Sequence, residues 1–136
     1  MKKFRIRTLV IMVAVLVMAL PIGVSAASTT LYADYARAKA SLSCSFRLKA
    51  LGNDSASACT ERTYLDPASP TKYRMAVRLE AWENKSQCTK YSYRNGDKKA
   101  STSLSAKDVV QFASRHSIDN SNNTKELAAK SFYDAE

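Results

Sequence analysis

Two segments of the chain alternate between apolar and polar side chains. Between residues 38 and 50 the even positions are apolar and the odd positions are lysine, arginine or serine. Between residues 72 and 81 the odd positions are apolar and most even positions are charged. Because the side chains of a strand point alternately to opposite faces, this period of two predicts two strands, each with one buried face. The predicted buried residues are Ala38, Ala40, Leu42, Cys44, Phe46, Leu48 and Ala50 in the first, and Tyr73, Met75, Val77, Leu79 and Ala81 in the second.

Three further short segments have the composition of strands. Residues 60–65 lead into a loop, residues 66–70, whose X-Pro pairs exclude a helix. Residues 89–93 and 98–104 flank Asn95-Gly96, a dipeptide whose tolerance of positive φ predicts a β-hairpin. Five strands at this spacing favour an all-β fold, a small antiparallel β-sandwich of about five to seven strands, with an α+β fold as the alternative.

The last third of the chain admits two interpretations. Ser105 and Asp108 have the spacing of a helix cap, which would begin a short helix. The pair Val109-Val110 favours a strand instead, because β-branched side chains disfavour short helices, and we prefer a strand up to His116. Residues 124–132 are rich in helix formers and predict a short C-terminal helix, with a frayed chain end as the alternative.

The first 26 residues have the three parts of an export signal. A basic start (Lys2, Lys3, Arg5, Arg7) precedes the apolar run Thr8–Leu20, and small residues at Val24 and Ala26 fit the pockets of a signal peptidase. We therefore expect a signal peptide, residues 1–26, cleaved before Ala27, and one secreted domain, residues 27–136. The alternative is an uncleaved N-terminal membrane anchor over Thr8–Val24, whose 17 residues are at the short end for a membrane span.

The charge of the chain changes once this signal is removed. The 136 residues contain 21 Lys and Arg against 12 Asp and Glu, a net charge of +9, of which the first 26 residues supply four. The remaining charge of +5 favours anionic partners, and we expect an anionic cell-wall polymer, a carbohydrate or a membrane surface. Nucleic acid is not expected, because the basic residues are scattered and the protein is exported. A domain of this size also rules out a multidomain enzyme.

Three cysteines, Cys44, Cys59 and Cys88, lie in the expected exported domain, where a disulfide can persist. The odd number predicts one bridge and one remaining thiol. Cys59 and Cys88 occur in similar polar contexts at the starts of strands, and we prefer this pair, with Cys44 as the third cysteine on an apolar face. A turn at Gly52-Asn53 would instead place Cys44 opposite Cys59, so this pairing stays open.

Residue patterns of known catalytic sites are scarce in this sequence. His116 is the only histidine, and its neighbours Ser114 and Asp119 are too close in sequence to converge on it from a strand. The sequence contains no nucleophile elbow, zinc-binding motif or glycine-rich phosphate loop. We therefore expect a non-catalytic protein with no cofactor and no metal ion.

The surface chemistry of the expected strands is aromatic and basic. All seven tyrosines and Trp82 lie beyond the export signal. Tyrosine and tryptophan supply amphipathic contact area for sugars and proteins, although tyrosine is also a common strand residue. The candidate binding residues are Tyr91, Tyr93, Trp82, Arg74 and Arg78.

The primary expectation is a small secreted binding module that acts at a cell envelope or surface. The layout of an export signal followed by a short Ser-, Thr- and Tyr-rich β domain resembles that of bacteriocins that fold as small β-sandwiches. This resemblance implies the first alternative, a bacteriocin-like secreted antagonist. The second alternative is a small extracellular hydrolase, which would need a cleft that gathers His116 with a carboxylate.

Overall fold

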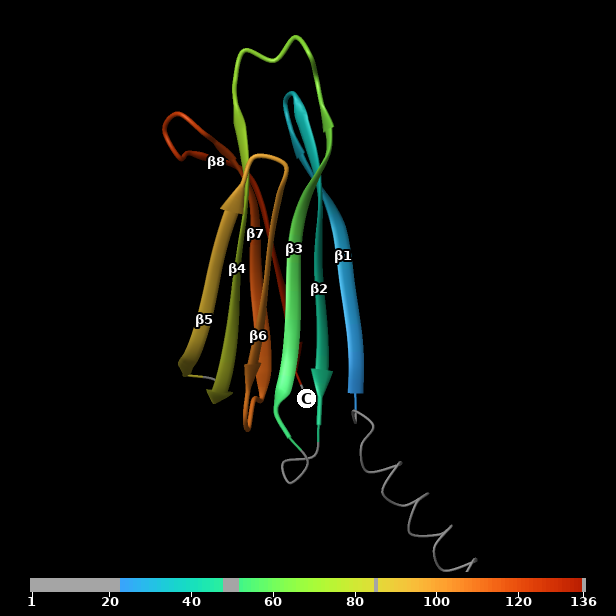
Figure 1. Cartoon of the computed structure of the whole chain (residues 1–136), viewed down its shortest axis with the longest axis vertical. Helices are drawn as coiled ribbons and strands as arrows, with labels where there is room; N and C mark the ends of the chain where they lie inside the picture. Colours follow the sequence, from blue (N-terminus) through green and yellow to red (C-terminus); the bar gives the residue numbers. More distant parts are fainter. Residues whose placement is uncertain (1–22, 48–51, 85, 136) are drawn as a thin grey trace, which may run out of the picture.

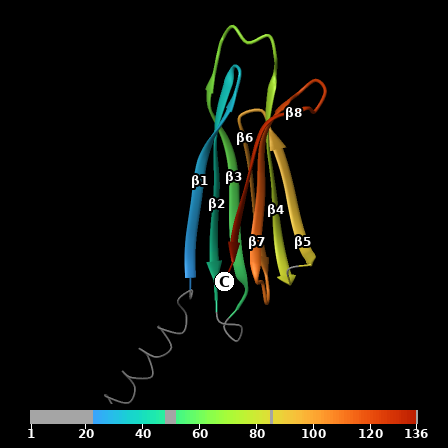
Figure 2. The ribbon, with the colours of Figure 1, turned by 180° about the vertical axis from the view of Figure 1, so that it is seen from behind.

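The computed structural model describes residues 23–47, 52–84 and 86–135, which form two four-stranded antiparallel sheets and contain no helix. Sheet A has the strand order β1-β2-β3-β6, and sheet B has the order β5-β4-β7-β8 (Figure 1; Figure 2 shows the same ribbon from behind). The all-β prediction is confirmed, with eight strands in a β-sandwich. The strands are β1 (Gly23–Ala33), β2 (Ala36–Phe46), β3 (Asp54–Leu65), β4 (Tyr73–Asn84), β5 (Gln87–Gly96), β6 (Lys99–Ala106), β7 (Gln111–Asn120) and β8 (Glu126–Ala135).

The core lies between the sheets and follows the predicted alternation. Every even residue from Ala36 to Phe46 in β2 and every odd residue from Tyr73 to Ala81 in β4 is buried; Leu48 and Ala50 lie outside the described residues. Sheet A meets the core largely with alanines, whereas sheet B presents larger side chains. Small residues opposite large ones let the two inner faces interdigitate. The alanines are Ala36, Ala38, Ala40, Ala56, Ala58 and Ala100, and the larger residues are Met75, Val77, Leu79, Phe112 and Ile118.

A buried carboxylate closes one end of the sandwich. Asp54, the first residue of β3, accepts hydrogen bonds from the backbone N–H of Arg47 at 2.7 Å and of Val109 at 3.1 Å. These bonds tie the end of β2 to the loop between β6 and β7. The preferred strand in the last third is confirmed, although it begins at Gln111, because Val109 belongs to this loop.

The predicted hairpin at Asn95-Gly96 is wrong. Asn95 and Gly96 are the last two residues of β5, and neither has a positive φ. Strands β5 and β6 belong to different sheets, so the turn at Asp97 and Lys98 carries the chain from sheet B to sheet A. Gly96 is required for a different reason: a Cβ there would lie 2.3 Å from the carbonyl oxygen of Lys99.

The predicted C-terminal helix is also wrong, because residues 126–135 form the edge strand β8. This strand pairs with β7 from Asp119 to Gln111. The residues from Glu126 to Lys130 have only a weak local preference for a helix. The backbone hydrogen bonds to the long neighbouring strand β7 outweigh this preference. Ala128 and Phe132 pack against the core.

The predicted cleavage point before Ala27 lies inside β1, and residues 1–22 are outside the described residues. Gly23 to Ala26 pair with Phe46 to Ser43 of β2. In addition, the hydroxyl of Ser25 donates a hydrogen bond to the carboxylate of Asp134 in β8, which joins the edge strands of the two sheets. No helix in the part of the chain that the structure describes is long and apolar enough for a membrane crossing.

The predicted disulfide is absent, because Cys44, Cys59 and Cys88 are all free. Cys59 lies in sheet A and Cys88 in sheet B. Cys44 faces the core, whereas Cys59 pairs in register with the outward-facing Ser41, so these two lie on opposite faces of sheet A. Burial raises the pKa of Cys44 to about 12, with Asp134 adding to the effect, and also raises the pKa of Cys59.

Candidate binding groove

The five candidate residues all lie on β4 and β5 of sheet B. Arg74, Arg78 and Trp82 share the outer face of β4, where they alternate with buried residues. In the neighbouring strand Tyr93 pairs with Arg78, and Tyr91 pairs with Glu80. The guanidinium carbon of Arg78 lies 4.5 Å from the centre of the Tyr91 ring, a cation–π distance. Four of the candidates therefore gather on one face, while Arg74 lies nearer the end of β4.

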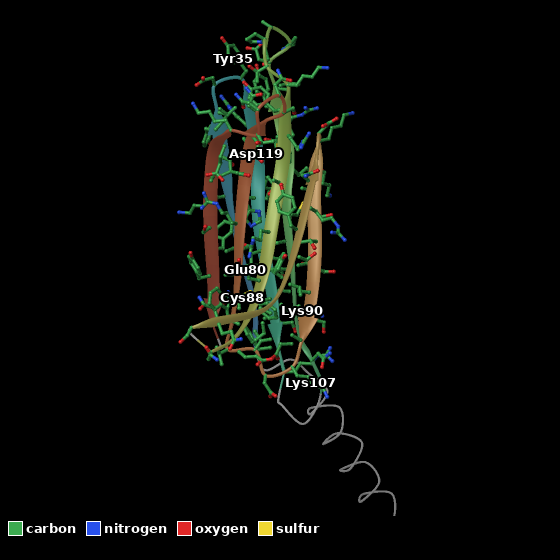
Figure 3. The ribbon with its side chains drawn as sticks, turned by 90° about the vertical axis from the view of Figure 1, so that its left-hand side faces the viewer. Tyr35, Glu80, Cys88, Lys90, Lys107 and Asp119 are labelled. Atoms are coloured by element: carbon green, nitrogen blue, oxygen red, sulfur yellow. The ribbon has the colours of Figure 1, made fainter. Side chains whose placement is uncertain are left out.

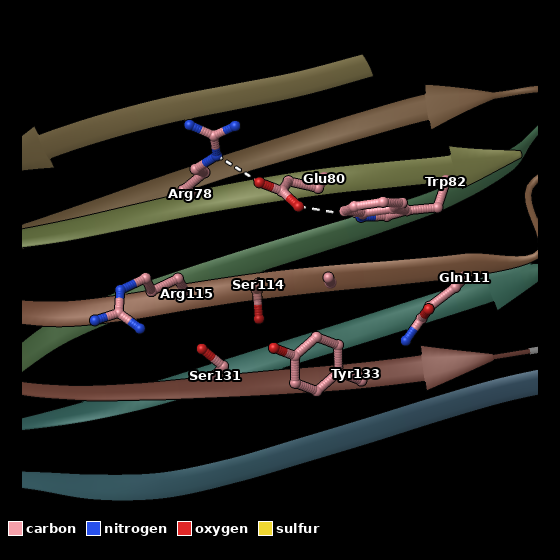
Figure 4. Close-up of a pocket in the computed structure, with 9 residues that line it drawn as sticks. Arg78, Glu80, Trp82, Gln111, Ser114, Arg115, Ser131 and Tyr133 are labelled. Atoms are coloured by element: carbon pink, nitrogen blue, oxygen red, sulfur yellow. Dashed lines mark hydrogen bonds and ion pairs between the residues drawn. The ribbon is translucent and has the colours of Figure 1, made fainter. Parts of the chain in front are cut away.

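Glu80 organises this face. Its carboxylate accepts a hydrogen bond from Nε of Arg78 at 2.6 Å and another from Nε1 of Trp82 at 3.1 Å (Figure 4). The three residues occupy alternate positions of one strand, so their side chains point to the same face. Figure 3 looks onto this side of the molecule, with Glu80 on the long sheet face between Tyr35 at one end and Lys107 at the other. The carboxylate holds the arginine and the indole in fixed positions, which pre-organises the surface.

The other wall of the groove comes from β7 and β8. Gln111, Arg115, Ser131 and Tyr133 line it together with the β4 residues, and the cavity has a volume of about 590 Å³. The floor is Ala113, which pairs with Glu80 on one side and with Tyr133 on the other. Because Ala113 is small and only 6 % exposed, the longer side chains around it form a trough across three strands.

Sequence reasoning missed the β7 and β8 residues of this groove. Tyr133 is 71 % exposed, more than any other large aromatic residue described. Its segment was expected to be a helix or a frayed end, and no local pattern places it two strands away from Glu80. The alternation in residues 111–120 was the available signal, because it places Ala113 and Arg115 on one face.

The arginines of the groove are already paired with carboxylates. Arg78 contacts Glu80, and Arg115 contacts Glu126 at 2.5 Å. The groove therefore offers hydrogen-bonding groups and aromatic surface with a balanced charge. Such a lining suits a polar, uncharged ligand better than a strongly anionic one.

His116 does not line the groove; it is fully buried between the sheets. Its Nδ1 lies 2.9 Å from Oγ1 of Thr60 in sheet A, and its Nε2 lies 2.8 Å from Oγ of Ser114. The prediction that Ser114 would not converge on His116 is wrong, because residues two apart on a strand point to the same face. Thr60 donates its own proton to the carbonyl of Ala76 at 2.9 Å. The Thr60 hydroxyl can then only accept a hydrogen bond from His116, so the imidazole carries its proton on Nδ1. Nε2 is therefore unprotonated and accepts a hydrogen bond from the Ser114 hydroxyl.

This histidine connects the two sheets as a neutral side chain. Burial lowers the pKa of His116 to about 4, against a smaller opposing effect of the Cys59 carbonyl. Its ring nitrogens bond to hydroxyl groups, not to a carboxylate. Within the described ranges, no three His, Cys, Asp or Glu side chains gather in a way that could hold a metal ion.

Comparisons of the chain with protein-family models, with curated proteins and with solved structures give no match.

Proposed function

We propose that this protein is an exported, non-catalytic binding module that recognises polysaccharide of a cell envelope through the outer face of sheet B. The observation that carries the proposal is the groove whose floor is Ala113 and whose sides include Trp82 and Tyr133. Export and cleavage before Ala27 belong to the same proposal and rest on the pattern of residues 1–26. Cleavage there would remove Gly23–Ala26 of β1, with the Ser25 hydrogen bond, and would leave Ala27–Ala33 paired with β2.

The groove has the chemistry that a sugar ring requires. Aromatic faces cover the apolar side of a sugar, and fixed polar groups select its hydroxyls. Trp82 and Tyr133 supply the aromatic surface, while Glu80, Gln111 and Ser131 supply acceptors and donors. The carboxylate of Glu80 already orients Trp82, so little conformational freedom is lost when a ligand binds.

Co-sedimentation with insoluble cell-wall polysaccharide tests this proposal. Trp82→Ala and Tyr133→Ala should each weaken binding by about tenfold, the effect of losing roughly 1.4 kcal/mol of aromatic contact. Tyr64→Ala is the matched control, because Tyr64 is a half-exposed tyrosine of sheet A. The proposal fails if the control weakens binding as much as the two groove variants do.

Three further measurements separate the alternatives. Binding to a neutral glycan should change little with salt, whereas binding governed by the net positive charge should fall steeply as ionic strength rises. Growth inhibition of related cells by the same preparation would favour the secreted antagonist. Release of soluble sugar from the polysaccharide would favour the hydrolase.

A further inference from the structure

A second cavity, separate from the groove, lies at one end of the sandwich. It has a volume of about 480 Å³ and is formed where the loop between β3 and β4 meets the turn between β5 and β6. Both connections lie at the end of the molecule drawn uppermost in Figure 1. We call this cavity the end pocket. The side chains that matter for its chemistry are Arg62, Asp66, Lys72, Arg74, Asp97 and Lys98.

Four of these side chains are basic and come from separate parts of the chain. Arg62 is near the end of β3, and its backbone N–H donates to the carbonyl of Lys98 at 2.8 Å, which fixes the β5–β6 turn beside β3. Lys72 precedes β4, and its carbonyl accepts from the N–H of Ser121 at 2.9 Å. Arg74 follows on β4. Backbone hydrogen bonds thus hold the segments that carry these four charges.

The charges in the end pocket are not balanced. Four cationic side chains line it against two carboxylates, Asp66 and Asp97. One oxygen of Asp66 already accepts the N–H of Ala68 at 2.8 Å. Arg74 pairs in register with Asp119 on β7, which offsets part of its charge. Even so, the ion pairs within 4.0 Å in the described residues all lie elsewhere, at Arg78, Lys99 and Arg115.

This arrangement differs from that of the groove. Arg78 and Arg115 each have a carboxylate partner, whereas Arg62 and Arg74 are half-buried and have none within that distance. A guanidinium that is partly removed from water gains most from an ionised partner, and its planar fork suits the oxygens of a phosphate. The missing negative charge can therefore come from a ligand.

We propose that the end pocket binds a phosphate group, as a phosphate monoester or phosphodiester of a soluble or polymeric ligand. A bilayer surface is the less suitable source of that group, because the cations line a concavity and the pocket includes only one exposed large aliphatic side chain, Leu65. Arg74 and Arg78 are four residues apart on the same face of β4, or about 13 Å along the strand. A phosphorylated glycan could then reach both sites, but the end pocket does not depend on the groove being a sugar site.

Titration of the full exported protein with inorganic phosphate and with glycerol phosphate, followed by NMR of the backbone amides, tests the proposal. Shifts should concentrate at the end pocket, around Arg62 and Lys98. The double variant Arg62→Gln/Lys98→Gln should weaken binding of both probes by at least about tenfold, or roughly 1.4 kcal/mol. The control Lys39→Gln/Arg94→Gln removes the same charge outside the pocket and should weaken binding by less than about twofold.

The single variant Arg62→Lys distinguishes the effect of the positive charge from that of the guanidinium geometry. It also provides a test that does not depend on correct folding of the double variant. It keeps the charge but not the bidentate fork, so its affinity should lie between those of the wild type and the double variant. The proposal is overturned if the control weakens binding as much as the double variant does, or if the wild type shows no shifts at the pocket. Binding to phosphatidylglycerol vesicles without binding to either small phosphate would also overturn it.

The groove and the end pocket can fail independently. Trp82→Ala should leave phosphate binding unchanged, and Arg62→Gln/Lys98→Gln should leave the binding of neutral polysaccharide unchanged. Loss of both activities in either variant would contradict the existence of two separate sites.

Discussion

The buried His116 should make the stability of the protein depend on pH. Its pKa is about 4 in the folded protein and 6.5 when it is exposed to water. Between these two values the unfolded chain binds a proton that the folded protein excludes, so the free energy of unfolding should fall as pH falls from about 6.5 to about 4. The difference of about 2.5 pKa units corresponds to about 3 kcal/mol.

This loss is a large fraction of the total free energy of unfolding, which is roughly 5–15 kcal/mol for a typical domain. With a urea dependence of about 2 kcal/mol per molar, the unfolding midpoint should fall by about 1.5 M urea between pH 7 and pH 4. The measurement is urea unfolding of the wild type and of His116→Gln across this range, followed by tryptophan fluorescence. Gln does not titrate there, so the difference between the two pH profiles isolates the histidine from the carboxylates.

Equal pH profiles for the two proteins would refute this reasoning. A second observation does not depend on the variant: NMR of the imidazole nitrogens at neutral pH should show a proton on Nδ1 alone. A proton on Nε2 would contradict the donor order from Ser114 through His116 to Thr60. A ring charged at pH 6 would contradict its burial.

Three further results are expected. Asp54→Ala should lower the free energy of unfolding by about 2–3 kcal/mol in thermal or urea unfolding, because the backbone N–H groups of Arg47 and of the buried Val109 both lose their acceptor. A change below about 0.5 kcal/mol would contradict a stabilising role of these two hydrogen bonds. Gly96→Ala should destabilise by about 2 kcal/mol, because the new Cβ meets the Lys99 carbonyl, and an unchanged melting temperature would argue against that contact. Thiol titration should find three free thiols after unfolding, and in the folded protein Cys44 should react slowest with an alkylating reagent. A count of one free thiol would show that a disulfide is present.

The strands of the core follow from local pattern. A buried face at every second residue is visible in residues 38–46 and 73–81 without knowledge of any partner, because the period of two is a property of the extended backbone itself. The candidate set Trp82, Arg78, Tyr91 and Tyr93 shares this origin: the alternation places Arg78 and Trp82 on the outer face, and the structure puts the two tyrosines beside them.

Local pattern failed where a neighbouring strand outweighs local preference. Glu126 to Lys130 prefer a helix in isolation, but β7 supplies a full edge of backbone partners. Asn95-Gly96 predicts a hairpin when only the turn is considered, yet β5 and β6 join different sheets. The preferred disulfide failed for a related reason, since similar sequence context says nothing about the distance between Cys59 and Cys88.

The sequence by itself determined that the chain forms half-buried strands, and it placed aromatic and basic residues on one outer face. Only the tertiary structure decided which strands share a sheet, that Tyr133 completes the groove with Trp82, and that Arg62, Arg74 and Lys98 meet at one end. The physical reason is the range of the interactions. The direction of a side chain depends on its own backbone, whereas a binding site depends on contacts between residues far apart in the chain.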